Sequence, residues 1–243
     1  MSSEPRPAFY ALAPGGWRDY VTLLHPPYTL WHLSYVGIGA ALAPELGLER
    51  LLLALTAFFL AVGIGAHALD ELKGHPLRTR ISDPVLIVLA AGSIGGAVAI
   101  GAYASLVYTA WLAPLVVVGA FIVCAYNLEL FGGLFHNDTW FALAWGSFPL
   151  LTAYVAMAER LRPEALLAAV FAGYLSLAQR RLSTQVRTVR RRVSAVSGTI
   201  EWREGARERL DAETLTAVPE AALRALTIAV VTLAAALLVL RLR

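Results

Sequence analysis

The sequence predicts an all-α protein, a polytopic membrane bundle of about seven transmembrane helices, and three observations lead to that fold class. Of the 243 residues, 58% are hydrophobic and only 15% are charged, which is too few charges to solvate a soluble domain of this length. Apolar runs long enough to cross a hydrocarbon core of roughly 30 Å recur along almost the whole chain. Short polar loops, rather than linkers between domains, separate these runs. We therefore expect one transmembrane helical domain, residues 28–243.

The first 27 residues predict a cytoplasmic tail and an interfacial segment. They contain Glu4, Asp19 and five prolines but no apolar core, so a secretory signal peptide is not expected. The Trp and Tyr residues of "WRDYVTLLHPPYTLW" suit the headgroup region of a bilayer.

Seven apolar runs follow this tail and define the expected spans. Glycines within them allow helix backbones to approach closely. The single cysteine, Cys124, lies inside one run and is expected to be a packing residue. The predicted spans are 28–44, 48–69, 84–104, 106–128, 139–157, 164–179 and 220–240.

The distribution of Lys and Arg predicts the orientation, because cytoplasmic loops are enriched in both. Basic residues gather in the tail, after the second span and in a long basic loop at about 180–219. The opposite side carries fewer. The N-terminus is therefore predicted inside, the C-terminus outside, and the second, fourth and sixth spans end at the cytoplasmic face. The residues counted are Arg6, Arg18, Lys73, Arg78, Arg80 and the arginines from Arg180 to Arg209 on one side, and Arg50, Arg160, Arg162, Arg241 and Arg243 on the other.

The end of the second span carries the first candidate site. His67, Asp70 and Glu71 share one helical face, because they are three and four residues apart. We expect Asp70 to be the central ligand or charge-stabilising group, with His67 and Glu71 as co-ligands or acid–base groups. Carboxylates favour Mg²⁺ or Mn²⁺, whereas imidazole favours Zn²⁺ or Fe²⁺. In the alternative interpretation, Glu71 pairs with Lys73 or Arg78 in the solvated loop that follows.

The end of the fourth span and its loop supply further candidates. Tyr126 and Asn127 are predicted to orient a substrate. Glu129, His136 and Asp138 are predicted to add metal ligands to those of the second span. In the alternative interpretation, Asp138 is only the N-cap of the next helix, and His136 lies in the membrane interface.

The basic loop allows two interpretations. The positive-inside signal and contact with anionic lipid headgroups account for its charge. Alternatively, Arg180, Arg181 or Arg187 binds a phosphate or diphosphate through forked hydrogen bonds, together with Arg78 and Arg80. Nucleic acid is not an expected partner, because the basic run has little aromatic interleaving. No phosphate-binding glycine loop, nucleotide fingerprint or serine elbow is present.

Three stretches resemble the UbiA-type intramembrane prenyltransferase superfamily, over roughly residues 20–185. They are "LLHPPYTLWHLSYVGIGAAL", "HALDELKGHPLRTR" and "AYNLELFGGLFHNDTWFALAWGSFPLLTAY". The resemblance implies a UbiA-like bundle in which Asp-rich motifs at the ends of the second and sixth helices hold Mg²⁺ against a prenyl diphosphate. Asp70 matches one aspartate of the first motif, and Gly74 occupies the place of the next. Gln179 and Gln185 stand where the second motif has carboxylates, and Phe131 replaces a basic residue.

The resemblance implies a transferase that handles a prenyl diphosphate or another membrane lipid at the cytoplasmic face. Two alternatives remain open at this point. The scaffold is reused, with a His/Asp/Glu metal site for different lipid chemistry, or the protein is a non-catalytic membrane scaffold subunit whose basic loop docks a cytoplasmic partner.

Overall fold

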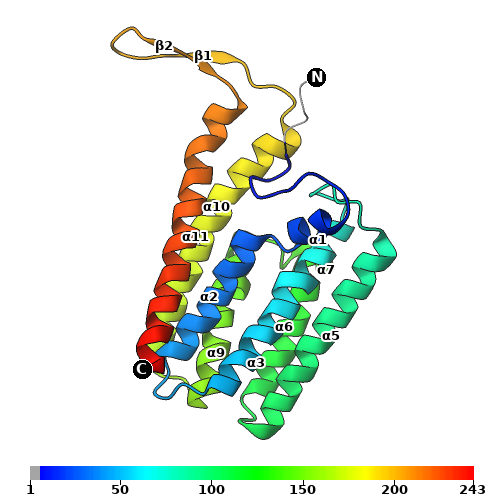
Figure 1. The fold of residues 1–243 in the computed structure, drawn as a ribbon, viewed down its shortest axis with the longest axis vertical. Helices are drawn as coiled ribbons and strands as arrows, with labels where there is room; N and C mark the ends of the chain where they lie inside the picture. The colour runs from blue at the N-terminus through cyan, green and yellow to red at the C-terminus, as the bar shows by residue number, and fades with distance from the viewer. Residues whose placement is uncertain (1–5) are drawn as a thin grey trace.

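The computed structural model describes residues 6–243 and shows a bundle of long helices with a thin β-hairpin at one end (Figure 1). Two segments, labelled η, are π-helical. In chain order the elements are α1 (Trp17–Leu23), α2 (Pro26–Leu42), α3 (Leu48–Phe58), η1 (Phe59–Ala66), α4 (His67–Leu72), α5 (Asp83–Val107), α6 (Leu112–Asn127), α7 (Leu130–Gly133), α8 (Asp138–Ala142), η2 (Leu143–Ser147), α9 (Phe148–Ala158), α10 (Pro163–Arg192), β1 (Gly198–Glu201), β2 (Arg207–Leu210) and α11 (Ala212–Leu242).

Within the described residues, four helices are long and apolar enough to cross a membrane: Leu48–Leu72, Asp83–Val107, Asp138–Ala158 and Ala212–Leu242. The first and third are continuous rods formed by α3–η1–α4 and by α8–η2–α9. These lengths and compositions are those of a helical membrane protein. The other three predicted ranges also coincide with helices, namely α2, α6 and α10, and their crossing of the membrane stays a prediction.

The segment expected to be a basic loop at about 180–219 is mostly regular structure. α10 continues to Arg192, and α11 already begins at Ala212. Arg, Gln and Leu are good helix formers, so the helix persists after its hydropathy has fallen. α11 starts at a capping box in which Asp211 accepts from the Thr214 N–H and the Thr214 hydroxyl bonds back to the Asp211 N–H. Between the two helices, β1 and β2 pair antiparallel, with Gly198 opposite Leu210.

Small residues allow the helices to pack closely. A Cβ on Gly39 of α2 would overlap the Leu150 carbonyl of α9, and one on Gly146 of η2 would lie 2.6 Å from the Ala172 carbonyl of α10. α2 therefore packs directly on α9 and α11, while α10 packs on η2 and α11. The pair α10–α11 extends past the other helices and carries the hairpin at its tip (Figure 1).

Candidate functional site

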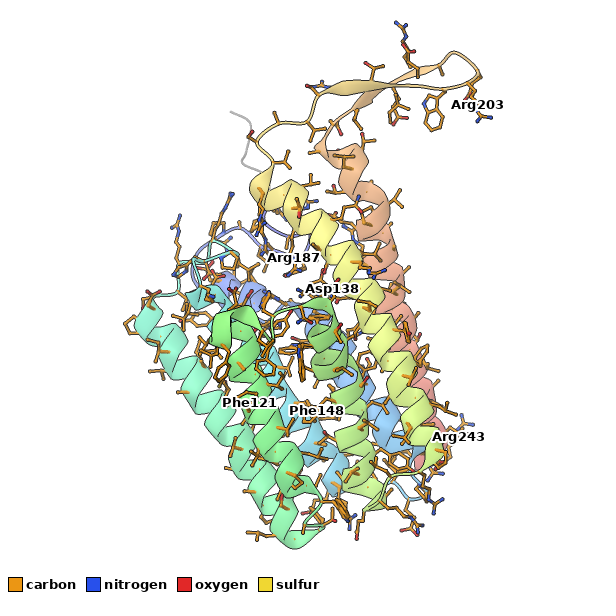
Figure 2. All side chains as sticks on the ribbon, turned by 180° about the vertical axis from the view of Figure 1, so that it is seen from behind. Phe121, Asp138, Phe148, Arg187, Arg203 and Arg243 are labelled. Carbon is orange, nitrogen blue, oxygen red and sulfur yellow. The ribbon has the colours of Figure 1, made fainter. Side chains whose placement is uncertain are left out.

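The polar candidates gather at the end of the bundle from which α10 and α11 project, which we call the basic end. Figure 2 shows Asp138 and Arg187 there and Arg243 at the opposite end. α4 contacts α6, and α8 contacts α10, near this end. The basic end thus brings together residues from the second, fourth, fifth and sixth long helices.

Glu71 is committed to the loop that follows α4. Its side chain is fully buried. Oε2 accepts from the Leu77 N–H at 3.0 Å, while Oε1 accepts from the Thr79 N–H at 3.0 Å and from the Thr79 hydroxyl at 2.8 Å. A buried carboxylate with three such donors fixes the backbone of residues 77–79. The structure therefore places Glu71 as a loop anchor. Its basic neighbour in the loop is His75, whose Nδ1 lies 3.5 Å from Oε1, whereas Lys73 pairs with Glu129.

The side chain of Asp70, the residue before Glu71, is neither buried nor bonded to the described residues of the loop. It is partly exposed, and within residues 6–243 its carboxylate makes no hydrogen bond or ion pair. It lies within electrostatic range of His67, Tyr10, Tyr126 and Arg191. Among the predicted residues, Asp70 is thus the acid that is available to a ligand.

His67 is oriented by a carbonyl of the π-helical segment η1. Its Nδ1 lies 3.1 Å from the Gly63 oxygen, and His32 of α2 pairs in the same way with the Trp145 oxygen of η2 at 2.8 Å. π-Helical geometry often marks functional sites, and it displaces carbonyls from the ordinary α-helical pattern. Since a carbonyl only accepts, Nδ1 carries the proton in both rings. In the neutral ring, Nε2 is then left as a free acceptor.

Arg180 of α10 connects the ends of three helices. Its Nε donates to Asp138 at 2.7 Å, its Nη1 donates to the Tyr126 hydroxyl, and its guanidinium lies 5.0 Å from the centre of the Phe141 ring. The Tyr126 ring packs 4.3 Å from the Trp145 ring. Arg180 therefore holds the Tyr126 hydroxyl and the Asp138 carboxylate together, whereas the neighbouring Arg181 is exposed.

The six predicted metal ligands do not come together. Glu129 pairs with Lys73 at 3.0 Å, and this hydrogen bond lowers the pKa of Glu129. The His136 ring stacks on the Tyr126 ring with 4.4 Å between their centres, and His136 Nδ1 lies 3.0 Å from the backbone carbonyl oxygen of Tyr126. In the part of the chain that the structure describes, no group of three or more His, Cys, Asp or Glu could hold a metal ion.

Other predicted roles are also changed by local geometry. The N-cap of α8 is Asn137, whose Oδ1 accepts from the Trp140 N–H at 3.0 Å, so the alternative that Asp138 is the cap is wrong by one residue. Asn127 uses its amide to bind the Val123 carbonyl at 2.7 Å, so that amide donates within its own helix. Arg78 and Arg80 are exposed on the loop after α4, and the Arg80 N–H donates to Asp19 at 3.1 Å.

Sequence reasoning missed a polar seam between α2 and α10. On the α2 side the residues recur at positions 25, 28, 32 and 35, and on the α10 side at 176, 179 and 183, spacings that place each set on one helical face. The Ser176 hydroxyl donates to the Tyr35 hydroxyl at 3.1 Å, and Tyr28 interacts with Ser183. Gln179 is buried, and its Oε1 has no partner in residues 6–243. The seam comprises His25, Tyr28, His32, Tyr35, Ser176, Gln179 and Ser183.

An apolar cavity of about 110 Å³ lies next to the polar residues, between α3–η1, α5, α6 and η2–α9. Trp145, Ile122 and Val123 line it toward the basic end. Arg50 and Tyr108 line it toward the opposite end, where the guanidinium lies 4.5 Å from the Tyr108 ring centre. Trp145 therefore belongs both to the cavity wall and to the Tyr126 cluster.

Comparison of the chain with protein-family models, curated proteins and solved structures finds no match.

Proposed function

We propose that this protein is a membrane-embedded transferase of UbiA type that handles a prenyl diphosphate or a similar lipid with an anionic head. One observation carries the proposal: the apolar cavity is walled by Trp145, whose ring packs 4.3 Å from Tyr126, and Arg180 donates to that tyrosine. Arg180 does not line the cavity but is linked to it through Tyr126 and Trp145. The arrangement matches an amphiphile whose hydrocarbon chain fills the cavity and whose negative head reaches past these two rings.

The arginines of α10 are suited to the head of such a lipid. Guanidinium groups bind phosphate oxygens through two parallel hydrogen bonds. Arg180 now uses this capacity on Asp138, whose side chain is 54% exposed. An ion pair with one exposed partner is worth little, so a diphosphate can displace Asp138. Arg187 and Arg191 lie further along the same helix, within electrostatic range of the polar cluster.

The chemistry follows from where charge develops. When the allylic carbon–oxygen bond breaks, its electron pair leaves with the diphosphate, and Arg180 stabilises the added negative charge. The acceptor forms a new bond to the allylic carbon and loses a proton. His67 Nε2 and the Asp70 carboxylate are the free acceptors that can take this proton.

The residues present do not fit a metal ion held by the protein alone. Mg²⁺ is commonly bound by one or two carboxylates together with substrate phosphates. Asp70 is the single predicted ligand with a free carboxylate, because Glu71, Glu129 and Asp138 are each bonded to protein groups. Arginines, rather than a metal held by the protein alone, therefore stabilise the developing charge.

The proposal includes the topology. α2, α6 and α10 cross the membrane together with the four long apolar helices, the basic end faces the cytoplasm, and the C-terminus lies outside. The concentration of Arg at the basic end supports this orientation. Anionic lipid headgroups are the expected surroundings of the exposed Arg78, Arg80 and Arg181.

The test is incubation of purified protein with labelled prenyl diphosphates of several chain lengths, with and without Mg²⁺, while diphosphate release and lipid binding are measured. Asp70→Asn and Arg180→Gln should each lower turnover at least tenfold. Arg203→Gln removes one charge at the exposed tip of the hairpin (Figure 2) and should leave turnover unchanged. If no chain length is bound and no diphosphate is released, the transferase proposal is wrong, and the scaffold alternative gains.

A further inference from the structure

The segment before α1 crosses the basic end instead of leaving the molecule. We call residues 6–14 the strap; its backbone runs over the ends of the bundle helices beside α10 (Figure 1). Pro7, Ala8 and Ala11 are buried. A polar tail that only projected into water would not bury these residues, so the strap is a packed part of the site.

Apart from the contacts of Tyr10, the strap touches three helices and the loop that follows α4. The Pro7 carbonyl accepts from Arg191 Nε of α10 at 3.2 Å, and the Arg224 guanidinium of α11 lies 5.1 Å from the centre of the Phe9 ring. Ala8 and Ala11 pack against Leu77 in the loop that Glu71 anchors. The Leu12 N–H donates to the Thr22 hydroxyl of α1 at 3.0 Å.

Tyr10 places the strap directly over the polar residues. Its ring lies 5.3 Å from that of His25 and 5.5 Å from that of Tyr28, and His25 in turn lies 3.9 Å from His67. Asp70, Arg187 and Arg191 are all within electrostatic range of Tyr10. Burial raises the pKa of Tyr10, so its hydroxyl is neutral while it covers the site.

The strap is followed by two glycines whose backbone conformations suit a hinge. Gly15 has φ +121° and Gly16 has φ +62°, and a Cβ on either would meet nothing within 4 Å. The backbone there adopts conformations that favour glycine, in open space. The strap is attached to the rest of the bundle by two hydrogen bonds, one cation–π contact, the packing of two alanines and the ring contacts of Tyr10 with His25 and Tyr28. Each of these contacts is worth about 0.5–1.5 kcal/mol, so opening breaks a limited set of individually weak contacts.

We propose that the strap is a lid, which opens about Gly15–Gly16 to admit a phosphate-bearing headgroup from the aqueous side and closes Tyr10 over Asp70 and His67. The identity of the headgroup rests on the proposed function, whereas the covering of the site does not. Closure excludes water from the site, which strengthens the contact between Arg180 and a bound diphosphate.

The first test measures the cover without any substrate. In a Cys124→Ser background, Ser183→Cys places a thiol on the α10 side of the seam at a residue that is 4% exposed. We expect a charged, water-soluble thiol reagent to modify it at least tenfold faster when Phe9→Ala and Tyr10→Ala loosen the strap. Thr184→Cys, at the exposed neighbouring position, is the matched control and should react equally fast in both backgrounds. Equal rates at Ser183→Cys would overturn the lid.

The second test locks the strap. Ala8→Cys with Leu77→Cys, in the same Cys124→Ser background, joins two residues that pack together. Binding of geranylgeranyl diphosphate should fall at least tenfold on oxidation and return with reductant, and the Ala8→Cys single variant should not respond. Equal binding in both redox states overturns the lid and leaves the transferase proposal standing. If neither geranylgeranyl diphosphate nor a prenyl diphosphate of any other chain length binds in either state, while Ser183→Cys stays protected, the transferase proposal is wrong and the covering role of the strap stands.

Discussion

Replacing Glu71 by Gln separates an anchor of the loop from a catalytic acid. The carboxylate holds the loop through the Leu77 N–H, the Thr79 N–H and the Thr79 hydroxyl. An amide keeps one acceptor oxygen, which can retain both Thr79 bonds, but its NH₂ group then faces the Leu77 N–H, donor against donor. Losing one bond to a charged acceptor and leaving a buried N–H unpaired costs about 3 kcal/mol.

The assay is amide hydrogen exchange of the loop in detergent. Because every 1.4 kcal/mol is a factor of ten, the Leu77 amide should exchange about 100-fold faster in Glu71→Gln if it exchanges through local opening. Glu201→Gln, on the exposed strand β1, is the control and should not change it. Unchanged exchange at Leu77 together with lost turnover would refute the anchor role and return Glu71 to the catalytic group.

Three further predictions follow from packing, protonation and charge geometry. Gly101→Ala should lower the free energy of unfolding by about 1–3 kcal/mol, measured by thermal unfolding, because its Cβ would overlap the Val116 side chain. The Cβ of Gly92→Ala on the same helix meets nothing within 4 Å, so this control should not lower stability. Equal effects of the two substitutions would contradict the close packing at Gly101. Burial lowers the pKa of His25 well below 6.5, so the unfolded chain takes up a proton below pH 6.5 that the folded chain refuses. Stability should be complete above that pH and fall by up to about 1.4 kcal/mol per pH unit below it. His25→Asn, which tolerates the left-handed backbone at this position (φ +45°), should make the decline between pH 7.5 and 5.5 shallower. Arg180→Lys keeps the charge but loses the fork, so pyrophosphate should bind about tenfold more weakly, whereas unchanged affinity would show that charge alone is used.

The positions of the long helices could be predicted because apolar length is a strong signal. Each of the seven predicted ranges overlaps a helix of the structure. The end of α10 could not be found in the same way, since hydropathy falls after residue 179 while helix-forming residues continue to Arg192. The hairpin was missed for a related reason: its strands are four residues each and largely exposed, so no buried alternation marks them.

The site could be predicted only in part. The sequence placed His67, Asp70 and Glu71 on one helix end, but it could not distinguish the free Asp70 from the anchored Glu71, because the donors to Glu71 are loop N–H groups that leave no pattern. It singled out Arg180 and Tyr126 without indicating that they bond to each other. The spacing of His25, Tyr28 and His32 indicates a polar face on α2, but this face carries no Asp, Glu, Lys or Arg, and the predicted site was centred on those residue types.

The π-helical segment η1 fixes the rotational phase of everything that follows it on the same rod. Each residue turns an α-helix by about 100°, and a π-bulge is equivalent to one residue inserted into that repeat. Deleting one residue within Phe59–Ala66 would let the rod become α-helical throughout and would swing His67 and Asp70 by about a quarter turn relative to α3. The helix would keep its apolar length, but Asp70 would turn away from Tyr126 and Arg191, which now lie within its electrostatic range. In this chain, a single residue within η1 therefore decides which side of the rod carries the free acid.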